Sequence, residues 1–333
     1  MKLNNIIKKV LILFFGILIL FFGINLTLYL LPSKQVIVNI PSGISAKEIA
    51  QILKSNNLIF NVDLFTGISD LFNISNKLKK GTYKFKITSP SFEILYKLYT
   101  GKNYKIKITI PEGFTCEQIA DILSSKNLVD KYKFIKFVEK NKYEGYLFPE
   151  TYFFDLGISQ QDLIDCMFKQ FKISIIKNIK QIKFDKKISI DEMKKIQIIL
   201  NTKKYTFNDI IILASIVEKE AKLDSERKII AGIFLNRLKK NWLLESCATV
   251  RYASKKYKEK LTYKDLKINS KYNTYKYHGL PPGPICNPGI KSIIAVLEPE
   301  NTDLMFFFNE KNKETHKFSK YYKEHIKSQK YKK

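Results

Sequence analysis

The 333-residue chain is poor in cysteine and histidine, and this scarcity excludes several classes of site. Its cysteines, at positions 116, 166, 247 and 286, are too few for a disulfide scaffold, and no two of them form a C-x-x-C pair. Its histidines, at positions 278, 316 and 325, form no H-E-x-x-H motif. We therefore expect no zinc site, no other metal and no cofactor.

Arginine is also scarce, with only three among 58 basic residues, at positions 227, 237 and 251. The formal net charge is +27, and lysine, isoleucine and asparagine are frequent along the whole chain. Nucleic-acid-binding proteins usually concentrate basic residues on one face, so this dispersed charge does not indicate a nucleic-acid partner. Two interpretations stay open: a solvated lysine surface, or a surface that attracts anionic lipids and polymers. Apolar residues make up 45% of the chain, which excludes a mostly disordered protein.

One long apolar run is present, from residue 10 to residue 31, and it reads VLILFFGILILFFGINLTLYLL. At 1.5 Å per residue a helix of this length spans about 33 Å, enough to cross a bilayer. Three lysines and no acidic residue precede it, which predicts a cytoplasmic N-terminus over residues 1–9. The sequence thus predicts a single-pass anchor in the inner (plasma) membrane and a periplasmic remainder. A cleavable signal peptide is the alternative. A Cys247–Cys286 disulfide stays open in that oxidising space.

Two segments 70 residues apart are similar to each other. Residues 36–59 and 106–129 each contain an alternating strand, a Pro-x-Gly turn and an amphipathic helix. A serine or threonine is placed to cap each helix, and a glutamate or glutamine three positions later completes a capping box. This internal repeat predicts a small α+β module over residues 34–143. A spacer and a glycan-binding module are its two possible roles.

From residue 144 onward the pattern is mainly helical. Apolar residues recur at steps of three and four, which predicts helices over 161–179, 190–200, 208–221 (capped by Asn208), 225–240 and 289–296. The proline- and glycine-rich residues 277–289 predict a fixed loop, residues 305–308 a short strand, and the lysine-rich last fifteen residues a frayed tail. The predicted fold class is α+β: a transmembrane helix, a small module and a mainly helical domain over 144–333.

The most apolar of these helices, 208–221, has a glutamate near its end. Glu218 is the first charge after the apolar stretch, and it lies on one line of the helix with Ala214 and Ser215. Their small side chains leave room for a groove, whereas Glu220 points about 200° away. An apolar wall favours the protonated form of a carboxyl group, which can then donate a proton to a leaving oxygen in glycoside cleavage. A glutamate that is solvated or paired with lysine is the alternative interpretation.

Polar and aromatic residues that suit a carbohydrate follow Glu218 in the sequence. All three arginines lie within residues 227–251, and a guanidinium group supplies planar, multi-donor hydrogen bonding that lysine cannot. Asn236 and Arg237 are adjacent on the next predicted helix. Asn273 and Tyr275 then lead into the fixed loop.

With these motifs the sequence resembles the YceG-like family of membrane-anchored endolytic murein transglycosylases. The motifs that carry the resemblance are, in chain order, EGYLFPETY from residue 144, LASIVEKE from 213, FLNRL from 234, YNTY from 272, GLPPGPI from 279 and NPG from 287. One family pattern, Leu-Gln-Thr/Ser-Asp-Pro-Thr-Val, departs at Glu245, Cys247 and Ala248.

The resemblance implies a LysM-like module, a catalytic domain and a set of site residues. Glu218 is the implied catalytic residue, and the implied substrate-binding residues are Ser215, Asn236, Arg237, Thr249, Asn273, Tyr275, Pro281, Pro282 and Asn287. The implied reaction cleaves the β-1,4 bond between N-acetylmuramic acid and N-acetylglucosamine in nascent peptidoglycan. Attack by the muramoyl C6 hydroxyl leaves a 1,6-anhydro end, and the cleavage limits strand length.

The implied partners are peptidoglycan strands and membrane-bound peptidoglycan synthases. Three alternatives stay open. They are a water-using muramidase, a non-catalytic membrane-tethered peptidoglycan-binding protein, and a polyanion-binding protein whose affinity vanishes with salt.

Overall fold

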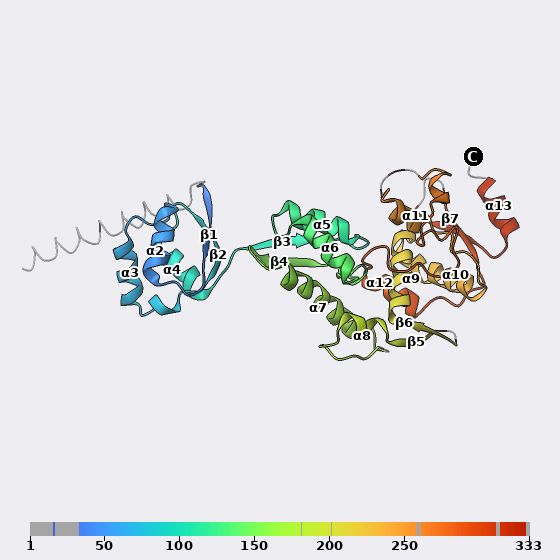
Figure 1. Cartoon of the computed structure of the whole chain (residues 1–333), viewed down its shortest axis with the longest axis horizontal. Coiled ribbons are helices and arrows are strands. Elements are labelled where there is room, and N and C mark those ends of the chain that lie inside the picture. Colours follow the sequence, from blue (N-terminus) through green and yellow to red (C-terminus); the bar gives the residue numbers. More distant parts are fainter. Residues whose placement is uncertain are drawn as a thin grey trace, which may run out of the picture. The chain divides into compact units, whose positions relative to one another are not determined.

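The computed structural model describes residue 16 and residues 33–180, 182–200, 202–257, 259, 261–310 and 314–330. The chain divides into two compact units (Figure 1). Unit 1 comprises residues 1–106 with 153–157, and unit 2 comprises residues 107–152 with 158–333. Helices alternate with small two-stranded sheets throughout, so the predicted α+β class is confirmed.

The predicted cytoplasmic segment 1–9 and the predicted anchor 10–31 lie outside the described residues, apart from Gly16. In the part of the chain that the structure describes, no helix combines the length and the apolar character that crossing a membrane requires.

Unit 1 has a two-stranded antiparallel sheet of β1 (Gln35–Ile40) and β2 (Gly81–Lys86). Its helices are α2 (Ala46–Ser55), α3 (Val62–Leu71), the 3-10 turn η1 (Ser75–Lys77) and α4 (Ser91–Thr100). Side chains alternate between the faces of a strand, so Val38 and Ile40 enter the core. There they join residues of β2 and of all three helices, among them Leu53, Phe65, Tyr83, Phe85 and Leu98.

The second copy of the repeat forms the same local structure as the first. β3 (Lys105–Thr109) leads into α5 (Cys116–Ser125) as β1 leads into α2, and a capping box begins both helices. The intervening turns place Gly43 and Gly113 at φ angles of 81° and 76°, a region that favours glycine. The predicted strand, turn and capped helix are therefore confirmed in both copies.

The two copies nevertheless belong to different compact units, because the division falls between residues 106 and 107 rather than at the predicted 143/144. Hydrogen bonds explain the difference. Gly113 donates its N–H to the carbonyl of Asn287, and Asn287 donates its N–H to the carbonyl of Phe114, both at 2.9 Å. The turn of the second copy is thereby joined to the proline-rich loop of unit 2.

Unit 2 is built around α9 (Phe207–Glu220), which packs against α10 (Arg227–Lys239), α11 (Cys247–Ser254) and α12 (Ile290–Leu297) (Figure 1). From Ile210 to Val217 every residue of α9 is buried. A helix that is apolar on all sides must be enclosed by others, so the predicted core helix is confirmed.

The other elements of unit 2 surround this group. The helices are α6 (Lys131–Lys140), α7 (Gln160–Asn178), α8 (Ile190–Lys194) and α13 (Tyr322–Lys330), with the 3-10 turns η2 (Asp224–Glu226) and η3 (Asp265–Lys267). The strands are β4 (Thr151–Asp155), which pairs with β3 and continues into unit 1, the hairpin of β5 (Gln197–Leu200) and β6 (Lys203–Thr206), and the pair of β7 (Phe306–Asn309) and β8 (His316–Ser319). Residues 277–289 form the expected loop without regular structure.

Three local predictions in unit 2 were wrong. The helix predicted over 190–200 ends at Lys194, because the β-branched residues that follow pair in the β5–β6 hairpin. The cap of α9 is Thr206, which forms a capping box with Asp209, while Asn208 accepts a hydrogen bond from the Tyr146 hydroxyl. The tail is helical over α13 rather than frayed.

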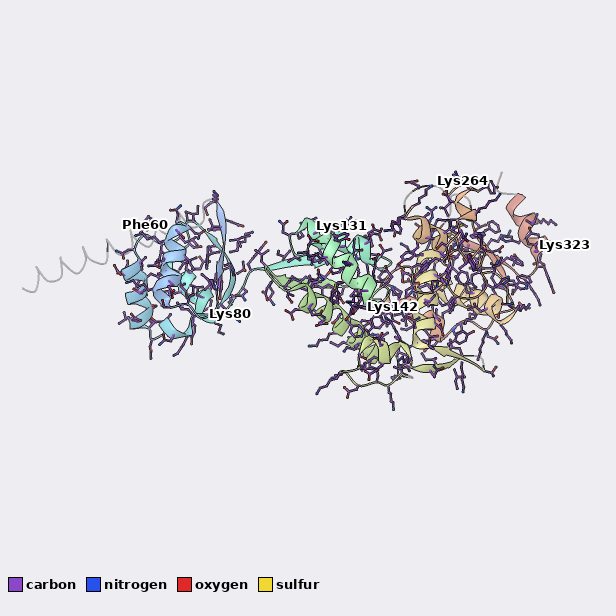
Figure 2. All side chains as sticks on the ribbon, viewed as in Figure 1. Phe60, Lys80, Lys131, Lys142, Lys264 and Lys323 are labelled. Atoms are coloured by element: carbon purple, nitrogen blue, oxygen red, sulfur yellow. The ribbon has the colours of Figure 1, made fainter. Side chains whose placement is uncertain are left out.

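The exposed lysines occur on both units. Lys80 in unit 1 and Lys131, Lys264 and Lys323 in unit 2 are all exposed (Figure 2). This distribution agrees with a charge spread along the whole chain.

Candidate active site

The side chain of Glu218, the predicted catalytic residue, is buried, and both of its carboxylate oxygens have polar partners. Its Oε1 lies 3.2 Å from Nη1 of Arg227, and the two side chains are 6% and 9% exposed. Its Oε2 accepts hydrogen bonds from the N–H of Gly289 at 3.0 Å and the hydroxyl of Ser292 at 2.8 Å. Arg227 also donates to that same hydroxyl and to Asp224. Every neighbour that contacts the carboxylate is a donor, which is typical of a buried structural ion pair.

The second repeat copy closes over this ion pair. A Cβ atom added at Gly113 would lie 3.5 Å from Cγ of Glu218, and one added at Gly289 would lie 2.0 Å from Oε1 of Glu112. Partial burial of the carboxyl group, together with the negative charge of Glu218, raises the pKa of Glu112. The Pro-Glu-Gly turn therefore places a second glutamate, Glu112, close to Glu218, which sequence reasoning missed.

The groove predicted beside Glu218 is filled by the proline-rich loop. The hydroxyl of Ser215 donates to the carbonyl of Ile212 at 2.7 Å and accepts from the N–H of Ile285 at 3.0 Å. Cys286 donates its thiol to the carbonyl of Ser215 at 3.3 Å. The small side chains on α9 thus admit backbone from residues 285–286 rather than a ligand, and the predicted groove is wrong at this position.

Glu220 occupies a different setting at the last residue of α9. It is partly exposed, and its Oε1 accepts hydrogen bonds from the hydroxyl of Ser246 at 2.5 Å and the N–H of Ala248 at 3.4 Å. Among the described residues its Oε2 has no hydrogen-bond partner. The carboxyl group therefore sits at the N-terminus of α11, with one oxygen open.

Tyr275 lies beside this carboxyl group. Its hydroxyl is 3.1 Å from the sulfur of Cys247, the first residue of α11. Burial raises the pKa of the Tyr275 hydroxyl, and the negative charges of Glu220 and Glu245 add to the effect. Tyr275 therefore stays a neutral phenol that can donate a hydrogen bond near Glu220.

Most of the other predicted substrate-binding residues hold loops in place. Asn287 is fully buried, donates to the Phe114 carbonyl at 2.9 Å and accepts from the Leu147 N–H at 2.9 Å. Asn236 donates to the carbonyls of Thr302 and Leu304. These amides bond to backbone groups and thereby hold the loops around the site.

Arg237, Thr249 and Asn273 behave in the same way. Arg237 donates to the carbonyls of Leu244 and Met305, each at 2.9 Å. Thr249 is fully buried and donates to the Ser246 carbonyl at 2.8 Å, which fixes the loop that carries the Glu220 contacts. Asn273 donates to two backbone carbonyls, and its side-chain oxygen accepts from the Tyr275 N–H at 3.0 Å. Pro281 is buried and Pro282 is exposed.

A groove of about 740 Å³ opens elsewhere in unit 2. Glu144 lies in its wall and accepts hydrogen bonds from the Cys116 N–H, the Tyr252 hydroxyl and the Asn287 amide. Burial raises the pKa of Glu144 from 4.5 to about 7. Pro282 lines this groove, and Glu218 and Glu220 are not among its lining residues.

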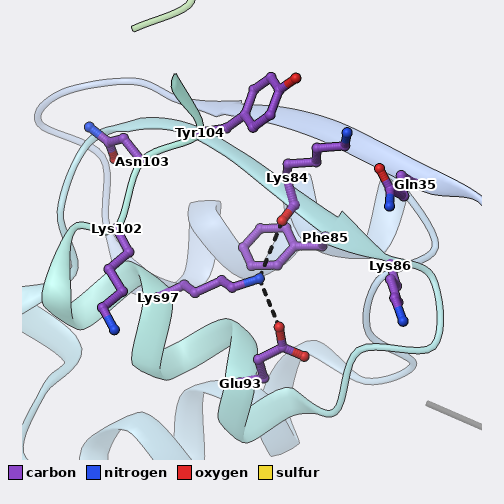
Figure 3. A pocket seen from close by; sticks show the side chains of 9 residues that line it. All are labelled: Gln35, Lys84, Phe85, Lys86, Glu93, Lys97, Lys102, Asn103 and Tyr104. Carbon is purple, nitrogen blue, oxygen red and sulfur yellow. Dashed lines mark hydrogen bonds and ion pairs between the residues drawn. The ribbon is translucent and has the colours of Figure 1, made fainter. Parts of the chain in front are cut away.

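Unit 1 has a smaller cavity of about 340 Å³ between β2, α4 and the segment that follows α4. Figure 3 shows four lysines, two aromatic rings and Glu93 around it. Lys97 pairs with Glu93 at 2.7 Å and lies 5.4 Å from the ring centroid of Phe85, while Lys84 lies 4.9 Å from that of Tyr104. Cationic and aromatic groups therefore line the cavity together.

Among the residues that the structure describes, no three His, Cys, Asp or Glu side chains gather into a possible metal site. All four cysteines are free thiols, so the Cys247–Cys286 pair that the sequence left open is not formed. Cys286 is buried and Cys247 exposed.

Comparison with known proteins gives the family. Residues 38–331 match the model of the YceG-like family. The chain is 35% identical over 320 residues to an endolytic murein transglycosylase of Bacillus subtilis, covering 88% of this chain and 83% of that one. It is 27% identical over 316 residues to an endolytic murein transglycosylase of Streptococcus pneumoniae, covering 82% of this chain and 54% of that longer one.

A solved structure supports the same conclusion. The crystal structure of a yceG-like protein of Listeria monocytogenes aligns with a TM-score of 0.55 at 31% identity, covering 89% of this chain and all of that one. The chain belongs to the YceG-like family, as its motifs suggested.

Proposed function

We propose that this protein is an endolytic murein transglycosylase that cleaves the glycan strands of peptidoglycan. Two relatives with that name cover more than four fifths of the chain, and the family model spans residues 38–331. The observation that carries the chemistry is the open carboxyl oxygen of Glu220, placed beside Tyr275 at the end of the buried helix α9.

Glu220 is the proposed proton donor, although the sequence assigned this role to Glu218. A general acid must come within hydrogen-bond reach of the leaving oxygen. The Glu218 side chain is 6% exposed, and Arg227, Gly289 and Ser292 occupy its oxygens. Glu220 is partly exposed and has an oxygen free to reach a substrate. Glu218 then acts by holding α9, α10 and α12 together.

The proposed reaction needs one carboxyl group and no water. Glu220 gives its proton to the glycosidic oxygen as the bond to the muramoyl C1 breaks, and N-acetylglucosamine leaves with a new hydroxyl group. The muramoyl C6 oxygen bonds to C1 of the same sugar, and its proton passes to the Glu220 carboxylate, which restores the acid. Because nucleophile and electrophile belong to one residue, proximity favours this internal attack. Such a plan differs from that of glycosidases with two carboxylates.

Of the three residues that depart from the family pattern, only Ala248 donates a hydrogen bond to Glu220. Ala248 contributes only its backbone N–H, and Cys247 contacts Tyr275 through its sulfur. Glu245 pairs with Arg237 at 3.2 Å. The hydrogen bonds that position the proposed acid thus depend on Ser246 and the backbone, which supports a functional site in spite of the substitutions.

Product analysis of three variants tests this assignment. Isolated sacculi are digested with the full chain and with Glu220→Gln, Glu218→Gln and Glu112→Gln, and the sugar ends are identified by mass. We expect wild-type products with anhydro ends, each lighter by one water than a reducing end. Glu220→Gln should lower the rate by about 10²-fold or more without loss of folded structure.

Glu218→Gln and Glu112→Gln serve as matched controls. Each should keep measurable cleavage at a temperature where circular dichroism shows the variant to be folded. Full activity of Glu220→Gln together with an inactive, folded Glu218→Gln would return the role of acid to Glu218. Reducing ends would indicate a water-using muramidase, and no products would indicate a non-catalytic peptidoglycan-binding protein.

The remaining parts of the proposal concern location and partners. Residues 10–31 are proposed as an anchor in the inner membrane, with the catalytic domain periplasmic and residues 1–9 cytoplasmic. Unit 1 is proposed to be LysM-like and to bind glycan through the cavity of Figure 3. Cleavage close to membrane-bound synthases would limit the length of nascent strands. Topology reporters fused at either end, and crosslinking to synthases, test these points.

A further inference from the structure

The 740 Å³ groove of unit 2 is lined by side chains of both charges and by tyrosines, and we call it the tyrosine groove. It contains residues of α5, α6, α8, α9 and α11 and of the loops around residues 144, 257, 270 and 283. Its lining residues are Thr115, Cys116, Glu117, Ile135, Val138, Glu139, Lys142, Glu144, Asp191, Lys194, Lys195, Asn208, Tyr252, Ala253, Lys255, Tyr257, Ser270, Tyr272, Pro282, Gly283 and Pro284.

Aromatic rings form one part of its lining. The rings of Tyr252 and Tyr272 are 4.9 Å apart between centroids, at an angle of 49°. Tyr252 also donates its hydroxyl to Glu144 at 3.3 Å, which fixes the orientation of its ring. Paired rings held in place by a partly buried hydrogen bond offer rigid apolar contact at a small cost in entropy.

Charged groups of both signs also line the groove. Lys194 donates to the carbonyl of Lys142 at 2.8 Å and lies 5.0 Å from the ring centroid of Tyr146. Its partial burial lowers its pKa to about 8. Glu139 and Lys195 are exposed at the groove. A neutral glycan makes no use of such charges, whereas a ligand with carboxylate and amino groups pairs with both.

The groove is joined to the proposed acid by two short segments. Ala248, near the start of α11, donates to Glu220, and Tyr252 of the same helix lines the groove. Four residues of helix rise by about 6 Å. The segment from Tyr272 to Tyr275 is the second connection, because Tyr272 lines the groove and Tyr275 lies beside Glu220. A side branch of a glycan strand bound at Glu220 can therefore reach the groove.

We infer that the tyrosine groove binds the peptide that branches from the muramoyl residues of the glycan strand. This inference rests on the proposed function, since it assigns a second part of the same substrate. Murein peptides are short and carry carboxylate groups, and those with a diamino acid also carry an amino group. The lysines receive the carboxylates, the exposed carboxylates of Glu139 and Asp191 receive the amino group, and the tyrosine rings pack against the aliphatic parts of the peptide.

A charge-swap variant tests the inference. Glu139→Lys/Lys195→Glu exchanges two exposed charges in the groove and leaves the net charge of the chain unchanged. Lys264→Glu/Glu314→Lys makes the same exchange at exposed positions outside the groove and serves as the matched control. The full chain and both variants digest two substrates, peptide-bearing strands and bare strands from which an amidase has removed the peptides, and kcat/KM is measured for each.

We expect the wild type to cleave peptide-bearing strands about tenfold faster than bare strands, a ratio typical of one or two charge pairs. The groove swap should cleave both substrates at the wild-type rate for bare strands, and the control should keep the wild-type ratio. Equal wild-type rates on the two substrates would overturn the inference. So would a groove swap that slows both substrates equally, because that result assigns the groove to the glycan.

Titration with an isolated murein peptide separates this inference from the proposed function. If neither substrate gives anhydro ends, the proposed function fails. Calorimetric binding of the peptide to the wild type and not to the groove swap would then still support the groove, whereas no binding to the wild type would overturn it.

Discussion

Glu218 and Arg227 form a buried ion pair that links α9 to α10, with 3.2 Å between Oε1 and Nη1. Arg227 is one of only three arginines in a chain with 58 basic residues. Its guanidinium group contacts Glu218, Asp224 and Ser292 at once. A lysine side chain has only one nitrogen and cannot make this set of planar contacts. The arginine is therefore needed here to hold the surrounding elements together.

We expect Glu218→Gln to lower the free energy of unfolding by about 3 kcal/mol, because it leaves the buried Arg227 without a counter-charge. Urea unfolding followed by circular dichroism measures the change. Lys228→Gln is the matched control, since it breaks the pair with Glu298, in which both side chains are about half exposed. The control should lose about 0.5 kcal/mol. Similar losses in both variants would contradict the structural role of Glu218.

Gly145→Ala should destabilise the protein by about 3 kcal/mol, through strain and overpacking. Gly145 has a φ of 88°, and an added Cβ would lie 2.6 Å from Pro284 and 2.8 Å from Ile211. The exposed Gly67 in α3, with nothing within 4 Å of an added Cβ, provides the control. Gly67→Ala should raise stability by about 0.5–1 kcal/mol. An unchanged free energy of unfolding in Gly145→Ala would show that the loop at Pro284 can shift to accommodate the added methyl group without cost.

Glu144 should make stability fall as pH rises from 4.5 to 7. Burial raises its pKa in the folded protein to about 7, so between these pH values the folded state holds a proton that the unfolded state has lost. Above pH 7 the loss is complete. We expect the unfolding free energy of the wild type, relative to that of Glu144→Gln, to decrease by about 3 kcal/mol between pH 4.5 and pH 8. A constant difference across this range would show that Glu144 keeps its ordinary pKa.

Thiol labelling should distinguish the four cysteines. Cys166 and Cys247 are exposed, whereas Cys116 and Cys286 are buried and burial raises the pKa of both thiols well above the ordinary value. A soluble maleimide should therefore modify two sites in the native protein and four after denaturation, as counted by mass.

Labelling of Cys247 should also block cleavage, because the added group would lie beside Tyr275 and the proposed acid. The variant Cys247→Ser, labelled at Cys166 alone, should stay active. Activity that survives complete labelling of Cys247 would place the substrate away from this end of α11.

Local patterns allowed much of the fold to be predicted. The alternating apolar residues and the capping residues were enough to predict the elements of both repeat copies. A strand, a tight turn and a capped helix depend on residues that are close in the sequence. The enclosed character of α9 followed from its apolar residues alone. The prediction missed the β5–β6 hairpin, where residues 197–206 carry apolar residues at a spacing compatible with either structure.

The sequence by itself determined the class of elements, the repeat, the family motifs and a pair of glutamates at the end of one buried helix. Only the tertiary structure decided which glutamate is buried by Arg227 and which stays open at Ser246. The physical reason is that helix periodicity gives the direction of a side chain but not what packs against it. For Glu218 the deciding neighbours are Arg227 at the start of α10 and Ser292 in α12. For Glu220 the deciding neighbour is Ser246, 26 positions along the chain and directly before α11.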